Sequence, residues 1–363
     1  MYYTYFYEPK FNEKKDQLTF DQIFDETLAL QATPHALSFR TIQIDAPTEQ
    51  SKRKIKSSMQ SFVKHFDDAV NALPDTSGCY TQFKIPKHSG GMRTINAPNP
   101  ELSTIMQNMR LYLEGCGILP HTSAYAYVKH RTTKMAVERH CRAKHTWYLK
   151  MDLHAFFDSC TEDFVNQQLM QIPHFAILAE CTDLKKYIHF WSLNNGLPQG
   201  TPISPWLTNQ IMVPVDYYLA NYCNQHNCIY TRYADDLIFS SNSKEFLRSL
   251  IDIVTLYFHT FTPFRINEKK TKIASVFGQN YILGLLANKD FNATIGHKKK
   301  ERLRATLHNF WIDQTSWSNE ARYELLGLIN YYMMIEPTYF QTLIDNFNIK
   351  HHTDIIQILK PPY

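Results

Sequence analysis

Ile229-Tyr-Thr-Arg-Tyr-Ala-Asp-Asp-Leu-Ile-Phe-Ser240 is the segment from which the architecture of this chain is most readily inferred. It consists of two β-prone runs that meet at a pair of acids, Asp235 and Asp236. Because side chains alternate across a strand and a tight turn exposes its tip, the two carboxylates concentrate negative charge at one point. An isolated Asp-Asp pair is usually a solvated turn. The alternative is a site that holds a hard divalent cation through oxygen ligands.

A second acidic segment, Trp147-Tyr-Leu-Lys-Met-Asp-Leu-His-Ala-Phe-Phe-Asp158, favours the cation site. It reads as an apolar strand that delivers Asp152 at its end and is followed by a compact aromatic turn. A carboxylate that leaves a buried strand can face an Asp-Asp hairpin on the neighbouring strand, which gives three acids around one or two Mg²⁺ ions. Asp158 lies beyond the aromatic pair, and we expect it to cap the helix that begins near Thr161.

The loop Gly196-Leu-Pro-Gln-Gly-Thr-Pro-Ile-Ser-Pro205 lies between the two acidic segments, and its Gly and Pro content breaks regular structure. From Trp206 onward, apolar residues recur at spacings of four, which predicts one buried helix face. The loop either simply caps this helix or lets the backbone approach a nucleotide or template closely, since glycine has no Cβ. Gln199 adds an amide that can donate and accept hydrogen bonds. The apolar positions of the predicted helix are Leu207, Ile211, Val215 and Leu219.

The three segments occur in the order acidic strand, Leu-Pro-Gln-Gly loop and Tyr-Ala-Asp-Asp hairpin. In this order they resemble the prokaryotic reverse transcriptases, the retron and group II intron lineage, over residues 83–295. The resemblance implies an α+β fold of the right-hand polymerase type, with fingers, a palm built on an antiparallel sheet, and a helical thumb. It also implies an RNA-directed DNA polymerase that uses two Mg²⁺ ions, or Mn²⁺ as a substitute, to extend a primer with deoxynucleotides on a structured RNA template.

By this resemblance the metal-binding catalytic acids are Asp152, Asp235 and Asp236, assisted by the Leu153 carbonyl. Two metal ions a few ångströms apart activate a 3′-hydroxyl and stabilise the leaving pyrophosphate during in-line displacement. The alternative is a polymerase-like scaffold or subunit that binds nucleic acid for a partner effector. Such a scaffold has no need for a cluster of like charges, which repel one another, and the acids therefore favour the polymerase.

Three further residues match substrate contacts of the family. Phe157, five residues after Asp152, matches the bulky side chain under the sugar that excludes a 2′-hydroxyl, and the alternative is a core aromatic, as expected for Phe156. Gln199 matches the contact to the incoming nucleotide, and Tyr233 matches the contact to the primer end. Because a bulky group at this place would clash with a ribose, Phe157 also argues against an RNA-dependent RNA polymerase.

Upstream of the acids, Phe83–Pro98 reads as two short strands around a Gly-Gly turn. The segment resembles the fingers hairpin that covers the nucleotide. Lys84 and Arg93 are then the cations that bind the triphosphate, one as a point charge and the other as a planar fork. Taken alone, a basic hairpin is more often only a soluble surface.

Downstream of the acids, Phe264–Ile273 resembles a family segment in which a Lys-Thr pair follows an Asn. This alignment selects Lys270 as the residue that stabilises the pyrophosphate or donates a proton to it. The adjacent alternatives are Lys269 and Lys272.

Two segments depart from the retron pattern. Retron enzymes carry an Asn-Ala-x-x-His signature before the first acidic strand and a Val-Thr-Gly triplet near the primer grip. The corresponding segments here are Thr122-Ser-Ala-Tyr-Ala-Tyr-Val-Lys-His130 and Ile282-Leu-Gly284. We therefore expect a defence-associated or unassigned bacterial group rather than a typical retron, with a role in antiviral defence.

The chain of 363 residues has a net charge of +4, and its basic residues are concentrated in residues 52–56 and 297–304. The second run is expected to open the first thumb helix, with Leu303 and Leu307 facing in and the cations facing out. Such a face is usually solvated, but a polymerase thumb must follow a phosphate backbone, so we expect nucleic-acid contact here. The partners implied are a structured non-coding RNA, the RNA/DNA duplex and deoxynucleoside triphosphates, together with a companion effector protein or further copies of the chain.

The length fits one polymerase, which we divide into four parts. Seven cysteines without a paired framework indicate a reducing compartment, and we expect the cytoplasm. No apolar run approaches 18 residues, so neither a membrane span nor a membrane partner is expected. The parts are an N-terminal extension (1–50), fingers (51–120 and 160–200), a palm (121–159 and 201–290) and a helical thumb (291–363).

Overall fold

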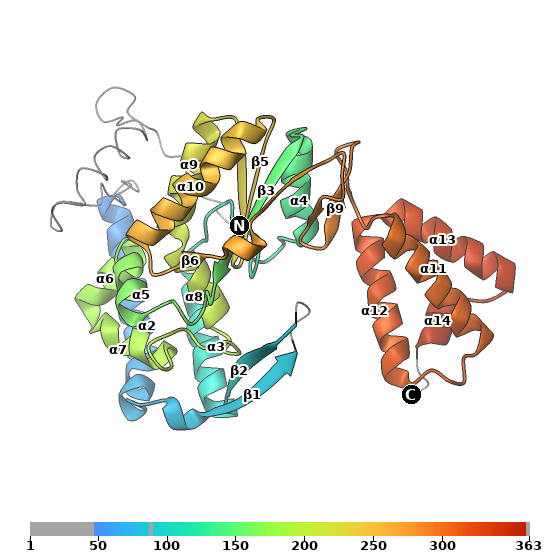
Figure 1. Ribbon diagram of the computed structural model, residues 1–363. Helices are drawn as coiled ribbons and strands as arrows, with labels where there is room; N and C mark the ends of the chain where they lie inside the picture. The colour runs from blue at the N-terminus through green and yellow to red at the C-terminus, as the bar shows by residue number, and fades with distance from the viewer. Residues whose placement is uncertain (1–46, 87–89, 361–363) are drawn as a thin grey trace.

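The computed structural model of the protein describes residues 47–86 and 90–360. It has an α+β architecture in which a five-stranded antiparallel sheet is flanked by helices, and the four C-terminal helices gather in a bundle of their own (Figure 1). Most of the extension expected at residues 1–50 lies outside the described residues. Within the described ranges, none of the helices has the length and apolarity needed to cross a membrane.

The elements divide into helices, short 3₁₀ turns and strands. The α-helices are α2 (Glu49–Ala72), α3 (Pro100–Gly115), α4 (Thr133–Arg142), α5 (Glu162–Leu169), α6 (Pro173–Cys181), α7 (Leu184–Trp191), α8 (Ser204–Ile211), α9 (Val213–Gln225), α10 (Lys244–Phe261), α11 (His297–Ile312), α12 (Asn319–Ile335), α13 (Pro337–His351) and α14 (Ile355–Leu359). The 3₁₀ turns are η1 (Ser77–Cys79) and η2 (Glu268–Lys270). The strands are β1 (Tyr80–Pro86), β2 (Met92–Pro98), β3 (Trp147–His154), β4 (Ile229–Tyr233), β5 (Asp236–Ser241), β6 (Arg265–Ile266), β7 (Lys272–Ser275), β8 (Tyr281–Ile282), β9 (Leu285–Ala287) and β10 (Ala293–Thr294).

The central sheet is organised around β3, which pairs with β5 on one side and with both β6 and β7 on the other. Side chains alternate along these strands, so the sheet has two faces with different neighbours. Leu149 and Phe239 lie on the face that packs into the larger hydrophobic core with α2, α3 and α5–α10. Tyr148 and Ile238 lie on the opposite face and join a second core that includes α4 and the C-terminal helices.

The strands expected within residues 83–98 are present as the hairpin β1–β2, in which Phe83 pairs with Ile95. Gly90 and Gly91 both have positive φ, at 86° and 81°, which fits the expected Gly-Gly turn because glycine adopts these values without a Cβ clash. In Figure 1 the hairpin extends away from the helices as a separate two-stranded ribbon.

Two local expectations are wrong. The single helix expected after Trp206 is divided into α8 and α9 at Met212, because Pro214 in the first turn of α9 has no backbone N–H to continue the helical bonding. The cap of α5 is Thr161, whose hydroxyl accepts a hydrogen bond from the backbone N–H of Phe164, and not Asp158. The hydroxyl directly before a helix reaches these first N–H groups, whereas Asp158 lies three residues further upstream.

The three-stranded sheet β10-β9-β8 leads from the central sheet to the C-terminal helices. α11 begins at His297, and its Leu303 and Leu307 are buried, as expected. The expectation that all its cations face outward is wrong for Lys300, whose ammonium pairs with Glu336 and lies 4.0 Å from the centre of the Tyr339 ring. The exposed cations of α11 are Lys298, Arg302 and Arg304.

Candidate active site

The three acids predicted from the sequence converge at one end of β3 and β5, the two internal strands of the central sheet. Asp152 on β3 and Asp236 on β5 are direct cross-strand partners, so their side chains lie on the same face. Asp235 belongs to the two-residue turn that joins Tyr233 to Asp236, and its carbonyl accepts a hydrogen bond from the Leu153 N–H at 3.0 Å. The strand register therefore brings together residues that lie more than 80 positions apart in sequence.

The first residue of this turn, Ala234, has a φ of 56°, a left-handed conformation that glycine usually supplies at this place in a hairpin. A non-glycine residue held in this conformation must be constrained by its surroundings. Ala234 is also buried, at 7% exposure. The turn that carries Asp235 is thus fixed by tertiary contacts rather than by its own sequence.

Two lysines pair with these acids. The Lys270 ammonium lies 2.9 and 3.1 Å from the two carboxylate oxygens of Asp152, and Asn267 donates a further hydrogen bond of 3.2 Å. These contacts arise because β6 and β7 pair with opposite ends of β3, which leaves η2 beside Asp152. The Lys150 ammonium lies 3.1 Å from Oδ1 of Asp236. Among the three candidate lysines, Lys270 is the one that contacts an acid of the site.

The surroundings of Asp235 and Asp236 favour proton uptake by these two carboxyls. Burial raises the pKa of the Asp235 carboxyl above its ordinary value, and the negative charge of Asp236 raises it further. Burial also raises the pKa of Asp236, although the charge of Lys150 acts in the opposite direction. The hydrogen bond to Asp152 raises the pKa of Lys270, which keeps this ammonium charged at neutral pH. Such mutual destabilisation of buried carboxylates is the condition that a bound cation would relieve.

The donor chemistry of the three acids fits a hard divalent cation, because all three side chains offer carboxylate oxygens. In residues 47–86 and 90–360, however, no group of three or more His, Cys, Asp or Glu side chains is arranged to hold a metal ion. The carboxylate oxygens of Asp152 and Asp236 are instead paired with the ammonium groups of Lys270 and Lys150.

The Leu-Pro-Gln-Gly loop contacts both the aromatic turn after β3 and the hairpin. The Leu197 N–H donates to the Phe157 carbonyl at 3.1 Å, and the Asn96 N–H donates to the Gln199 carbonyl at 2.7 Å. Phe156 is buried at 4% exposure, as expected for a core aromatic, whereas Phe157 is only partly buried at the margin of the core. Phe157 and Gln199 are thus held in adjacent segments.

The two cations predicted on the hairpin lie on opposite faces of it. Lys84 pairs with Thr94, and Ile85 pairs with Arg93, so alternation places Lys84 and Arg93 on different sides. The two cations would therefore approach a ligand from opposite faces of the hairpin.

Tyr127 is a residue that the sequence did not single out. It lies in the loop before α4 with a φ of 60° and is half exposed, at 51%. The pKa of its hydroxyl is raised, first by desolvation and then by the charge of Asp235, while the charge of Arg93 acts to lower it. The charges of Asp235 and Arg93 therefore both act on this hydroxyl.

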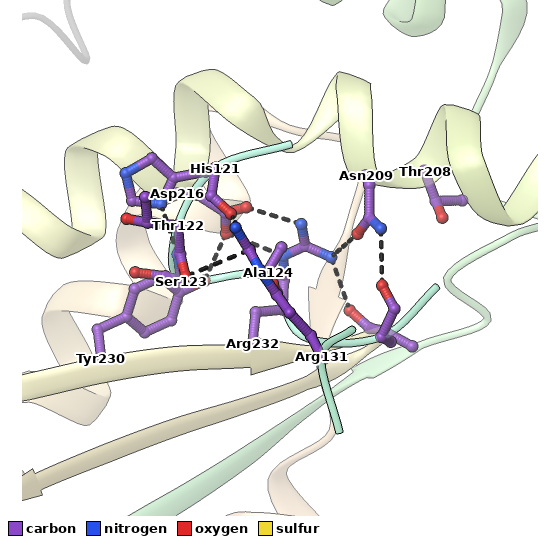
Figure 2. A network of polar contacts seen from close by, with 12 residues as sticks. His121, Thr122, Ser123, Ala124, Arg131, Thr208, Asn209, Asp216, Tyr230 and Arg232 are labelled. Carbon is purple, nitrogen blue, oxygen red and sulfur yellow. Dashed lines mark hydrogen bonds and ion pairs between the residues drawn. The ribbon is translucent and has the colours of Figure 1, made fainter. Parts of the chain in front are cut away.

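A buried polar network lies behind the acidic turn (Figure 2). Arg232 and Asp216 are both fully buried, and the guanidinium binds both carboxylate oxygens at 2.7 and 2.8 Å. Tyr230 donates to the same carboxylate at 2.8 Å. The sequence signal for this network is an arginine inside an apolar strand, but nothing in the sequence identifies Asp216 as its partner.

Comparison with known proteins adds an independent finding. Residues 85–328 match the family described as reverse transcriptase (RNA-dependent DNA polymerase). Curated relatives include the retron Ec73 reverse transcriptase of Escherichia coli, 32% identical over 72% of this chain and 85% of the relative. The retron Ec83 enzyme of Escherichia coli is 27% identical over 80% of this chain and 93% of the relative. The retron Mx65 enzyme of Myxococcus xanthus is 29% identical over 71% and 62%, respectively.

Solved structures give a more distant likeness. The telomerase of Candida tropicalis in complex with a TWJ fragment of telomeric RNA is 14% identical and covers 74% of this chain and 55% of that chain. The TM-score is 0.43.

Proposed function

Because this chain belongs to the reverse transcriptase (RNA-dependent DNA polymerase) family, we propose that Asp152, Asp235 and Asp236 form its polymerase site, with the Leu153 carbonyl as a further metal ligand. Family membership gives the right-hand polymerase fold, RNA-directed DNA polymerase activity and a need for divalent metal in general. The finer proposal is a pair of Mg²⁺ ions, for which Mn²⁺ can substitute. The cross-strand pairing of Asp152 with Asp236, beside the Asp235 turn, is the observation that supports it.

The three carboxylates and Lys270 are proposed to have different roles in the reaction. When bound, the metal ions supply Lewis-acid activation of the primer 3′-hydroxyl and neutralise the leaving pyrophosphate. The three carboxylates would hold these ions and, through them, keep the reacting groups in line. The charged ammonium of Lys270 would pass from Asp152 to the pyrophosphate. The retron names of the relatives and the resemblance in sequence motifs support deoxynucleotides as the substrate.

Further residues are proposed to bind the substrates. We propose that Lys84 and Arg93 bind the triphosphate, from opposite faces of the hairpin. Phe157 is proposed to lie under the sugar, Gln199 to contact the incoming nucleotide, and Tyr233 to contact the primer end. The hydrogen bonds that tie the Leu-Pro-Gln-Gly loop to Phe157 and to the hairpin support these roles, because they hold the segments together.

We propose the domain division stated from the sequence: an extension at residues 1–50, fingers, palm and thumb. The grouping of the C-terminal helices around a separate part of the core supports the thumb at 291–363. The central sheet lies within the proposed palm, at 121–159 and 201–290, and the hairpin lies within the proposed fingers, at 51–120 and 160–200.

The template is proposed to be a structured non-coding RNA, copied into an RNA/DNA duplex in the cytoplasm, as part of bacterial antiviral defence. The retron relatives support this template, and the exposed cations of α11 support contact with its phosphates. A companion effector protein or additional copies of the chain would complete such a system. Sequencing of the nucleic acid that copurifies with the protein tests the template, and plaque counts with and without the gene test the defence role.

The central experiment is primer extension with Asp235→Asn. We expect loss of deoxynucleotide incorporation by at least about a hundredfold, the effect of removing several kcal/mol of transition-state stabilisation, with RNA binding retained. Asp252→Asn, at an exposed position on α10, is the matched control and should extend normally. Unchanged extension by Asp235→Asn would refute the proposed site.

A further inference from the structure

Arg232 is the last residue before the Tyr-Ala-Asp-Asp turn, and its guanidinium is fully buried. Two of its nitrogens, Nε and Nη2, bind Asp216 at 2.8 and 2.7 Å. The third, Nη1, donates to Oδ1 of Asn209 at 3.1 Å and to the carbonyl of Ala234 at 3.2 Å. Figure 2 shows this side chain between Asp216 and Asn209. All three nitrogens are therefore engaged, and one of them reaches the turn itself.

The ion pair with Asp216 accounts for only part of this arrangement. A bidentate contact through Nε and Nη2 is sufficient to neutralise the buried carboxylate and fixes the plane of the guanidinium. The contact to Ala234 adds nothing to that pair. It does satisfy the carbonyl of the residue whose left-handed backbone, with a φ of 56°, sets the direction in which the chain enters Asp235.

A second branch of the network reaches the loop that carries Tyr127. Asn209 donates from Nδ2 to the Ala126 carbonyl at 2.7 Å, and the Arg232 N–H donates to the Ser123 carbonyl at 2.7 Å. Ala126 directly precedes Tyr127, as Ala234 directly precedes Asp235. Arg232 and Asn209 therefore bind the backbone at or next to two residues with left-handed conformations, Ala234 and Tyr127.

We propose that Arg232, together with Asn209, is a positioning residue of the polymerase reaction. Its guanidinium fixes the backbone of the Tyr-Ala-Asp-Asp turn, and thereby the carboxylates of Asp235 and Asp236, while Asp216 holds the guanidinium in place. This inference rests on the proposed catalytic role of Asp235 and Asp236. The competing interpretation is that the buried ion pair serves only the stability of the fold.

Arg232→Lys is the test variant, because a single ammonium keeps the charge opposite Asp216 but cannot occupy the places of all three guanidinium nitrogens. Tyr230→Phe is the matched control, because it removes a hydrogen bond to the same carboxylate on a residue that makes no contact with the turn. Asn209→Leu is a second, uncharged test variant with the same branching at Cγ, which removes the Asn209 hydrogen bonds and leaves the ion pair intact. The readouts are kcat in primer extension, the melting temperature, and the rise in melting temperature on addition of MnCl₂ alone.

We expect kcat to fall at least tenfold in Arg232→Lys and Asn209→Leu, with the Mn²⁺ needed for a half-maximal thermal shift raised at least threefold. Tyr230→Phe should lower the melting temperature yet keep kcat and the Mn²⁺ response within twofold of the parent. If a folded test variant keeps both values, or if Tyr230→Phe loses as much as the test variants, the positioning role is wrong.

Asp235→Asn is assayed in parallel to separate the two proposals. If Asp235→Asn extends primers normally, the proposed site fails, whatever the test variants do. If Asp235→Asn is inactive while Arg232→Lys and Asn209→Leu are fully active, only the positioning role fails. Should Arg232→Lys not fold, Asn209→Leu alone decides the outcome, since it introduces no unpaired charge.

Discussion

The Lys150 ammonium lies 3.1 Å from Oδ1 of Asp236, on the same face of the central sheet. Lys270 makes the equivalent contact with Asp152. Two of the three acids are thus paired with a lysine, and a cation that binds these acids must compete with both ammonium groups.

Lys150→Met should therefore strengthen metal binding. Removal of the competing charge is expected to raise the affinity for Mn²⁺ about two- to fivefold, the range expected for a partly exposed ion pair. Titration of MnCl₂ followed by isothermal calorimetry checks this in the full chain without substrate. Lys150→Arg keeps the charge and is the control that should bind with the parent affinity. Weaker binding by Lys150→Met would show that Lys150 supports the metal site rather than competing for it.

The raised pKa values of Asp235 and Asp236 predict how stability depends on pH. In the window above about pH 4, the ordinary value for Asp, the folded protein binds more protons than the unfolded chain. The stability contributed by these acids is therefore fully present below about pH 4. It is lost as the pH rises through the raised pKa values of the folded protein. Asp235→Asn removes the part of this pH-dependent loss of stability that comes from Asp235, because an amide does not ionise. In EDTA, the variant should melt about 1–2 °C above the parent at pH 7 and no higher than the parent below pH 4.

Asp313 provides a control of opposite sign for this experiment. Hydrogen bonds from Thr315 and Ser316 lower the pKa of its carboxyl, so its contribution is present above the ordinary Asp value and is lost as the pH falls. Asp313→Asn should consequently lower the melting temperature at pH 7 and have a smaller effect at low pH. A pH-independent difference between Asp235→Asn and the parent would contradict the electrostatic explanation.

The sequence predicted the convergence of the acids because that convergence depends on strand pairing. An apolar strand that ends in Asp152 and a hairpin that ends in Asp235 and Asp236 have one compact way to pair, and alternation then determines the shared face. The β1–β2 hairpin and the start of α11 followed from local turn and helix signals in the same way.

What the sequence could not supply is the identity of long-range polar partners. Asp216 lies on the buried side of a helix and Arg232 on a strand, and no periodicity relates them. The pairing of Lys150 with Asp236 depends on which strand lies beside β3. The opposite directions of Lys84 and Arg93 depend on the exact register of the hairpin, which a turn signal leaves open by a residue.

Substitution of Gly200 by a residue with a side chain should destabilise the protein. Its φ is +121°, and an added Cβ would lie 2.8 Å from the Asn96 carbonyl oxygen and 2.9 Å from Cγ2 of Ile95. Gly200→Ala is expected to cost about 1–3 kcal/mol in stability and to raise the KM for deoxynucleotides, because Gln199 moves with the loop. Melting curves and steady-state primer extension measure the two effects.

Gly327 in α12 is the matched control for this substitution, since nothing lies within 4 Å of its added Cβ. Gly327→Ala should stabilise the protein by about 0.5–1 kcal/mol, because alanine loses less backbone freedom in a helix. A neutral Gly200→Ala would mean that the hairpin moves away from the loop without effect on the site.

Phe157 provides the sharpest test of substrate selection. Its partly buried ring lies at the margin of the core and its carbonyl is bound by Leu197, so truncation to Ala should open space beside the site with little loss of stability. Phe157→Ala is expected to raise kcat/KM for ribonucleotides relative to deoxynucleotides by at least tenfold. Phe156→Ala is the control: Phe156 is 4% exposed, and loss of its ring should cost about 3–5 kcal/mol without a change in sugar selectivity. If selectivity is the same in Phe157→Ala as in the parent, Phe157 packs the core and another residue excludes the 2′-hydroxyl.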